Sequence, residues 1–417
     1  MYGNNGFNAY RQPGINQPYG DTGYNPASGS YANNPYGTGP YNNNPYNNTP
    51  YNNNPYNNNP YNNNPYNNNP YAYNPYVYAP KRKKSFSERF NEYFRKKPYS
   101  GLAALAGFSS LGIMLYLGLS TALGGLIVLL SSVCPDLFTG EAGFAVLGML
   151  SSAMCVGLPF IIVYGIMNRY DNTSFRIPFN KPRKGSHWGL LIVAGLGLCY
   201  LGNIITGYFT AIFQAFGIDF ASTELSESIS SSHETPLGFV LTLIYVAVCP
   251  AIFEEIAFRG VILQPLRKYG DWFAIIVSSV IFGLVHGNMT QMPFAIIVGV
   301  ALGYTFIVTD SIIPSMIIHF LNNGLSLVYS TVLSGLSEEK MIIFSSVFVY
   351  GLVFIGFVAF FAYKKTNRYY RHLRKGDYPE IGTKRKAGTY FLMPSMLAAV
   401  IILVFQVLSD IMVGALM

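Results

Sequence analysis

Two adjacent carboxylates lie inside an apolar stretch that is otherwise suited to cross a membrane. Glu254 and Glu255 interrupt the run 245–263, and Arg259 follows Glu255 by four residues. Charged groups at bilayer depth are costly, and they usually face the protein interior at functional sites. On a helix Glu255 and Arg259 share a face and can form an ion pair, whereas Glu254 points about 100° away and is available for another task. A carboxylate in an apolar wall suits a general base, but a purely structural ion pair explains this segment equally well on its own.

Two further apolar segments each carry a histidine, although the whole chain has only five. His286 follows Phe282 by four residues, and His319 precedes Asn323 by four, so each pair shares one face of its helix. An imidazole and an amide held on one rigid helix are donors suited to a developing oxyanion, and Asn322 could equally be the exposed amide. Taken singly, each histidine is more simply explained as a hydrogen bond between helices.

The depths of these groups favour a shared site. At 1.5 Å per residue from the nearest cytoplasmic connection, Glu254 lies roughly 15 Å into the bilayer, His319 roughly 12 Å and His286 roughly 22 Å. Three polar side chains at compatible depths are hard to explain as unrelated contacts. Pro250 precedes Glu254 by four residues and cannot donate its backbone hydrogen bond, so we expect a bend or an exposed carbonyl near the site.

The composition is that of a membrane protein. Of the 417 residues 50% are hydrophobic and only 11% are charged, and the mean hydropathy is +0.26, whereas a soluble domain has about 25% charged residues. The pattern predicts an all-α fold, a polytopic transmembrane helical bundle of about nine spans with a disordered N-terminal tail. The spans are expected near 102–132, 142–167, 188–213, 237–263, 272–287, 293–309, 312–335, 341–363 and 390–414.

The chain divides by composition into six segments. Residues 1–80 form a tail with Tyr-Asn-Asn-Asn-Pro repeats, whose regular prolines exclude helix and sheet and which has little to bury in a core. The others are a basic juxtamembrane segment at 81–100, two N-terminal spans with a basic loop at 101–187, a membrane core at 188–363, a basic cytoplasmic loop at 364–388 and a last span at 389–417.

The net charge of +8 is gathered beside the apolar spans rather than in the tail. Basic and acidic connections alternate along the chain in the way that the positive-inside rule requires for a cytoplasmic N terminus. We therefore expect an integral, multi-pass protein of the plasma membrane. Its expected partners are the lipid bilayer and a membrane-associated protein or peptide substrate, and no nucleic acid is expected, because the basic runs directly flank membrane spans.

The three motifs, taken in order, resemble those of the CPBP intramembrane proteases, also called the CAAX prenyl protease type II or Abi family. They are Glu254-Glu255-x-x-x-Arg259, Phe282-x-x-x-His286 and His319-x-x-x-Asn323. Each motif alone is weak, but together on apolar helices they are specific, and the resemblance covers roughly residues 188–335 and at most extends to 363. It implies that Glu254 and His286 activate a water, that His319 and Asn323 stabilise the oxyanion, and that Glu255 and Arg259 organise the site.

The resemblance implies a membrane endopeptidase that hydrolyses peptide bonds of membrane-associated proteins or peptides. The family is commonly labelled metalloprotease, and Glu254, His286 and His319 could supply a set of two histidines and one glutamate for a divalent metal such as zinc. Activation of the water by glutamate without a metal is equally open, since the chain has no contiguous HExxH motif.

Two other functions fit the same residues. A membrane protein that binds a peptide toxin and confers immunity needs no catalysis, and members of the family resemble that role too. A proton-coupled transporter would use the buried carboxylates and histidines as a relay. No inverted repeat or pair of broken helices favours transport.

Overall fold

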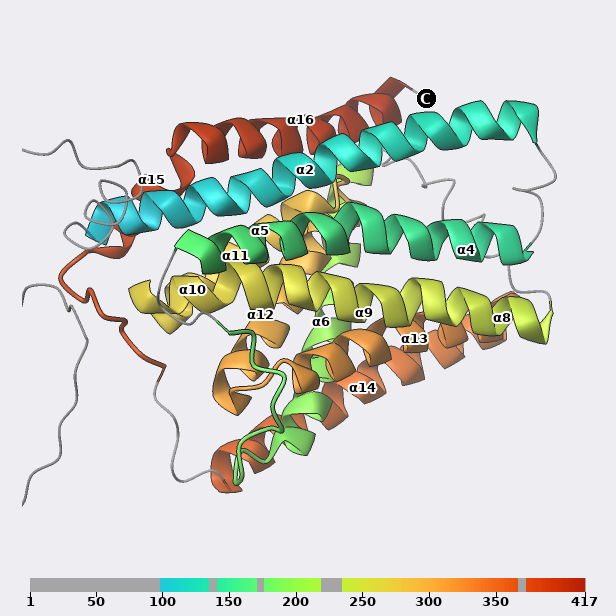
Figure 1. Ribbon diagram of the computed structural model, residues 1–417. Coiled ribbons are helices and arrows are strands. Elements are labelled where there is room, and N and C mark those ends of the chain that lie inside the picture. The colour runs from blue at the N-terminus through green and yellow to red at the C-terminus, as the bar shows by residue number, and fades with distance from the viewer. Residues whose placement is uncertain (1–97, 135–140, 171–175, 219–234, 367–372, 417) are drawn as a thin grey trace, which may run out of the picture. The chain divides into compact units, whose positions relative to one another are not determined.

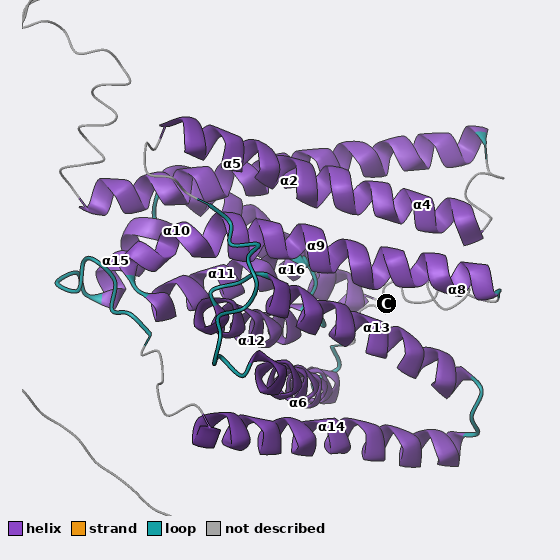
Figure 2. Cartoon of the chain, turned by 60° about the horizontal axis from the view of Figure 1, so that its bottom comes forward, coloured by secondary structure: helices purple, strands orange, loops and turns teal. Residues whose placement is uncertain are grey.

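The computed structural model describes residues 98–134, 141–170, 176–218, 235–366 and 373–416, and every regular element within these ranges is a helix (Figures 1 and 2). The predicted all-α fold is therefore confirmed for the described part of the chain. The tail at 1–80 and the basic segment at 81–97 lie outside the described residues, so the expectations for them stay predictions.

The elements follow one another without a strand in the described ranges. Those before the paired carboxylates are α2 (Pro98–Val133), α4 (Glu141–Ser151), the π-helix η1 (Ser152–Gly157), α5 (Leu158–Tyr170) and α6 (Trp188–Ala215). One continuous helical rod then contains α8 (Pro236–Leu243), η2 (Ile244–Val248), α9 (Cys249–Glu254), η3 (Glu255–Leu263), α10 (Gln264–Leu266) and η4 (Arg267–Tyr269). The remaining helices are α11 (Asp271–Val285), α12 (Met292–Thr309), α13 (Ile313–Ser334), α14 (Glu338–Thr366), α15 (Thr383–Phe391) and α16 (Pro394–Leu416).

The number of membrane spans is close to the predicted nine, but not identical to it. Seven of the described helices are long and apolar enough to cross a membrane, and an eighth results if α15 and α16, which meet at a bend of 81°, count as one span. Helix α11, expected as the span at 272–287, has 15 residues, or ~22 Å of helix against a hydrocarbon core of ~30 Å. Helix α15 begins inside the stretch 364–388, which we expected to be a loop.

Local signals set the ends of the helices around the paired carboxylates. The Thr235 hydroxyl accepts a hydrogen bond from the Gly238 backbone N–H at 3.0 Å and caps the start of α8. Asn288 acts similarly before α12, because its Oδ1 accepts from the Gln291 backbone N–H at 2.8 Å. Between η4 and α11 the chain turns at Gly270, whose φ of 124° is one that side-chain-bearing residues rarely adopt.

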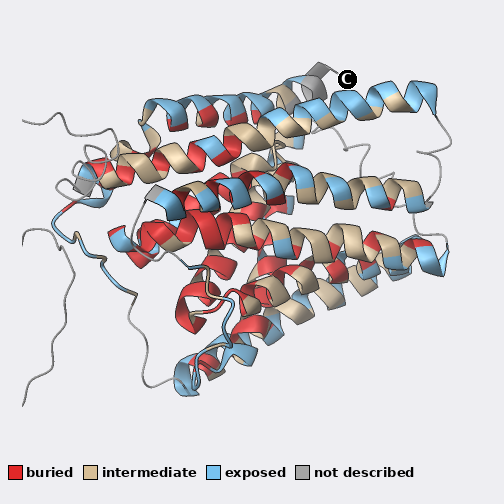
Figure 3. Ribbon diagram, in the orientation of Figure 1, coloured by how far each residue is buried: buried red, intermediate tan, exposed pale blue. Residues whose placement is uncertain are grey.

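The rod 236–269 lies between two groups of helices (Figure 1). Helices α2, α4 and α5 with η1 contact it from one side, whereas α11, α12 and α13 contact it from the other. Buried residues gather around η3, α10, α11 and α12 (Figure 3), and this core includes Phe258, Leu263, Ile275 and Phe306. The second half of the rod, which starts near the paired carboxylates, is therefore its most enclosed part.

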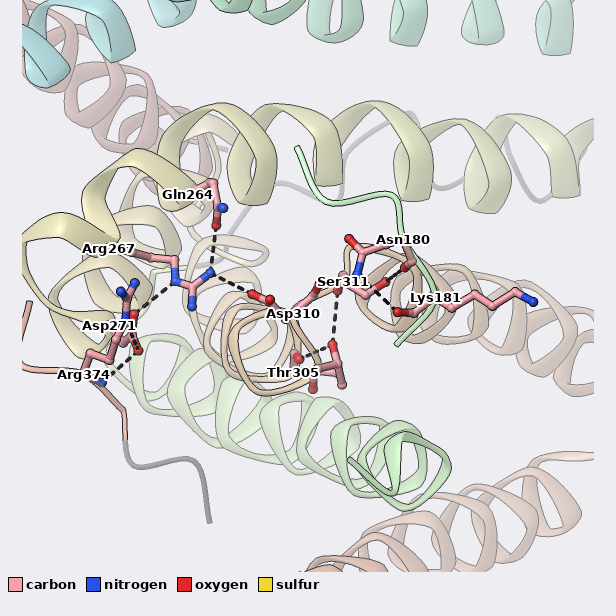
Figure 4. A network of polar contacts seen from close by, with 10 residues as sticks. Asn180, Lys181, Gln264, Arg267, Asp271, Thr305, Asp310, Ser311 and Arg374 are labelled. Carbon is pink, nitrogen blue, oxygen red and sulfur yellow. Dashed lines mark hydrogen bonds and ion pairs between the residues drawn. The ribbon is translucent and has the colours of Figure 1, made fainter. Parts of the chain in front are cut away.

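A polar network holds the turn between η4 and α11 (Figure 4). Arg267 donates to Asp271 Oδ1 at 3.1 Å, to Gln264 Oε1 at 3.0 Å and to Asp310 Oδ1 at 3.3 Å. Asp271 is fully buried, and its Oδ2 accepts from the Arg374 backbone N–H at 2.9 Å. The network thus joins the base of α11 to the end of α12 and to the segment before α15.

Candidate active site

A buried ion pair anchors the site. Arg259 Nη1 lies 2.9 Å from Glu255 Oε1, and neither side chain is more than 1% exposed. The guanidinium also donates from Nη2 to the Gly299 carbonyl at 3.4 Å and lies 4.7 Å from the centre of the Phe282 ring. The predicted pair is therefore present, and it connects η3 to both α12 and α11.

His319 links the two glutamates. Its Nδ1 lies 3.0 Å from Glu255 Oε1, and because a carboxylate oxygen accepts, Nδ1 carries the proton in this contact. The other ring nitrogen, Nε2, consequently faces Glu254, whose Oε2 is 3.7 Å away. Of the two carboxylates only Glu254 has an appreciable exposed fraction, 21% against 0% for Glu255. Glu254 is thus the carboxylate that a substrate or a water can reach.

His286 lies at the C-terminal end of α11 with one ring nitrogen already engaged. Its Nδ1 lies 2.8 Å from the Phe282 carbonyl, which only accepts, so the proton is on Nδ1 and Nε2 keeps a lone pair. The Phe282 ring meets both histidines edge to face, with ring centres 4.9 Å from His286 and 6.0 Å from His319. Phe282 is therefore the packing centre that relates His286 to the buried ion pair.

Asn323 binds the rod from α13. Its Nδ2 donates to the Val246 carbonyl at 3.0 Å, and Asn322 donates to its Oδ1 at 3.0 Å. Pro250 has no N–H with which to bond Val246 in the α-helical pattern, so this is the exposed carbonyl that the proline predicts. Asn322 is buried and Asn323 only partly so, which makes Asn323 the accessible amide. One of its two N–H groups remains for another acceptor.

Two π-helical stretches flank α9, which ends at Glu254. Glu255 begins η3, and η2 carries the Val246 carbonyl that Asn323 binds. Short π-helical segments occur mostly within α-helices and often at functional sites, because the wider turn changes the direction of side chains and carbonyls. Apart from Pro250, the sequence has no signal for them.

The predicted metal ligands do not form a set in the described residues. No group of three His, Cys, Asp or Glu side chains in that part of the chain is placed to hold one ion. Glu254 and His319 approach each other, but His286 is related to them through Phe282 rather than by a direct contact. The side chains as placed do not fit the three-ligand set, and the chemistry below is argued from protein groups.

Most of the site residues predicted from the sequence are connected to one another by contacts in the structure. Glu254, Glu255, Arg259 and His319 form one connected group, Asn323 binds the same rod, and His286 joins through Phe282. One further side chain near the site was not predicted from the sequence. Tyr116 on α2 donates to the Val285 carbonyl at 3.3 Å, next to His286 in the chain. A tyrosine in an apolar helix is ordinary, and nothing in its sequence context marks it.

A known family matches the part of the chain that carries these residues. Residues 236–325, which include all three motifs, match the family described as type II CAAX prenyl endopeptidase Rce1-like. This segment, about a fifth of the chain, is similar to that family. We refer to residues 236–325 as the CPBP segment.

A curated protein of Bacillus subtilis (strain 168), "Putative membrane peptidase YdiL", is similar to part of the chain. It is 30% identical over 113 residues, which cover 24% of this chain and 43% of that protein. The chain therefore spans less than half of this relative's length. No solved structure shows a significant match to the chain. The apolar helices make this an integral, multi-pass membrane protein, and its segment 236–325 is similar to a membrane peptidase family.

Proposed function

We propose that the CPBP segment is the catalytic core of an intramembrane endopeptidase that hydrolyses peptide bonds of membrane-associated proteins or peptides. One observation carries the proposal. The partly exposed Glu254 lies beside His319, and a buried chain of contacts to Glu255 and Arg259 holds His319 in place. A single accessible carboxylate beside an oriented imidazole is the arrangement that general base catalysis requires.

In the proposed reaction a water attacks the scissile carbonyl carbon and gives up one proton. Glu254 and the Nε2 lone pair of His286 are the acceptors available for that proton. The tetrahedral intermediate carries its negative charge on the former carbonyl oxygen. The second N–H of Asn323 stabilises this oxyanion, and so does His319 in its doubly protonated form, in which Nε2 also carries a hydrogen. The proton then passes to the leaving amine as the C–N bond breaks, so that Glu254 and His286 return to their starting state.

Glu255 and Arg259 have a different role in this proposal. Both are fully enclosed, so they cannot touch a substrate, and their contacts fix the ring of His319. We further propose that the N terminus is cytoplasmic, that the site opens toward the cytoplasm, and that the protein resides in the plasma membrane. The alternation of basic and acidic connections supports the orientation.

The test compares the membrane proteomes of cells that express the wild type, Glu254→Gln or Glu339→Gln. Glu339 is an exposed glutamate at the start of α14 and serves as the matched control. We expect an uncut precursor to accumulate and its fragments to vanish only with Glu254→Gln, while all three proteins reach the membrane in equal amounts. Identical fragments in all three strains would refute the peptidase and leave a binding or immunity protein, which tolerates this substitution.

A further inference from the structure

Tyr116 reaches the site from outside the CPBP segment. It lies on α2, and its hydroxyl donates to the Val285 carbonyl at 3.3 Å, a link between residues 169 positions apart. The Val285 carbonyl belongs to the peptide group whose nitrogen is that of His286. The phenol therefore holds the peptide plane that directly precedes the histidine proposed to accept a proton.

The end of α11 leaves backbone carbonyls that such a partner can bind. The carbonyls of the last helical turn have no partner within the helix. In this turn the backbone N–H of His286 bonds to Gly283 and that of Gly287 bonds to Leu284, both in the tighter 3₁₀ pattern. Tyr116 binds the next carbonyl. Its hydroxyl consequently restrains the end of the helix at the residue where the imidazole is attached.

The helix that carries this phenol also packs beside the rod that carries the proposed base, Glu254. Tyr116 is partly buried, and helix α2 packs against both η1 and η3. Tyr116 is therefore on a helix beside the rod that carries Glu254, and its hydroxyl binds the end of α11 that carries His286.

Close packing sets the position of Tyr116. Gly112 lies one helical turn before it, and a Cβ at Gly112 would be only 2.8 Å from the Phe160 ring of α5. The Phe160 ring in turn packs on Phe258 of η3, with ring centres 5.8 Å apart. Helix α2 is thus packed tightly against α5 at Gly112, and the Phe160 ring connects this contact to Phe258 of the CPBP segment.

From these contacts we infer that Tyr116 is a positioning residue for His286, supplied by a helix that the family match does not include. The inference rests on the proposed peptidase function. A hydrogen bond of 3.3 Å is long for an O–H donor, so its effect is modest.

The variant Tyr116→Phe tests the inference because it removes one oxygen and keeps the ring. The probe is a quenched fluorescent peptide that contains the junction cut in wild-type membranes, and the proteins are full-length in detergent. We expect kcat to fall by about threefold to tenfold, the range for the loss of one hydrogen bond. KM and the melting temperature should stay unchanged, since the ring still fills its place. A purely structural role would instead lower the melting temperature and leave kcat intact.

Two controls separate the possible failures. Tyr350→Phe changes an exposed tyrosine on α14 and should leave kcat at the wild-type value. Glu254→Gln should abolish cleavage of the same peptide. If Glu254→Gln still cuts, or if no wild-type junction is found, the proposed function fails and this inference fails with it. If Glu254→Gln is inactive while Tyr116→Phe keeps full kcat, only the role of Tyr116 is refuted.

Discussion

His319 Nδ1 lies 3.0 Å from Glu255 Oε1. The same oxygen lies 2.9 Å from Arg259 Nη1, so one buried atom holds both an imidazole and a guanidinium. This sharing gives the two adjacent glutamates different roles. Glu255 orients His319 and Arg259. Glu254 keeps an accessible carboxylate beside Nε2 of His319.

The first prediction concerns the loss of this shared oxygen's charge. Glu255→Gln leaves the Arg259 guanidinium buried without a counter-charge, which costs about 3–5 kcal/mol of stability. We expect a clearly lower melting temperature in detergent, followed by circular dichroism, together with loss of cleavage. Glu254→Gln should lose cleavage but melt like the wild type, because its side chain is partly hydrated. Equal melting temperatures for the two variants would contradict the division of roles.

The sequence was sufficient to predict some of these contacts. The spacing of Glu255 and Arg259 predicts their ion pair from helical geometry alone, and the structure confirms it. Pro250 likewise indicates a carbonyl with a missing partner, which Asn323 binds. Both signals are local, since they depend only on the four-residue period of one helix.

Contacts between distant segments could not be predicted in the same way. The sequence does not indicate that Phe282 lies against Arg259, His286 and His319 together, or that Tyr116 reaches the end of α11. Such contacts depend on how helices cross, and many apolar sequences permit several crossings. The role of each assembled residue in the reaction stays a prediction until the variants above are measured.

The fold shows the same contrast between local and distant information. Long apolar runs predict helices because a membrane span must satisfy its own backbone hydrogen bonds, and the described residues are indeed helical. The length of the apolar run predicted a membrane span at 272–287. Helix α11 instead ends at Val285, and a polar turn capped by Asn288 follows. The basic composition of the segment before α16 predicted a loop, but this segment contains the short helix α15. The buried Lys386 of α15 donates to the Tyr269 carbonyl.

The second prediction concerns the network at the base of α11. Asp271 is fully buried and bonds both the Arg267 side chain and the backbone of Arg374. Asp271→Asn removes a charge from these bonds, which contribute about 1.5–3 kcal/mol when charged groups take part. We expect a lower melting temperature and faster hydrogen exchange in the segment around Arg374. Asp377→Asn is the control: this side chain is exposed, and its backbone bond to Lys268 is unaffected. Unchanged exchange in Asp271→Asn would show that the network does not hold the segment.

The third prediction uses two glycines of α14. A Cβ on Gly356 would clash with the backbone at Gly197 of α6, whereas one on Gly351 meets nothing within 4 Å. Overpacking at a close helix contact costs about 1–3 kcal/mol, while alanine in an open helical position is favoured over glycine by about 0.5–1 kcal/mol. Gly356→Ala should therefore lower the melting temperature in detergent, and Gly351→Ala should leave it unchanged or raise it.

These two variants also separate stability from catalysis. Helix α6 packs on α12 and α13, and α13 carries His319, but neither glycine contacts the candidate site. At a temperature where Gly356→Ala is still folded, its kcat should equal that of the wild type. If both alanine variants melted alike, α6 and α14 would not approach as closely as Gly197 and Gly356 allow. A fall in kcat without a fall in melting temperature would instead show that this helix contact positions α13 for the reaction.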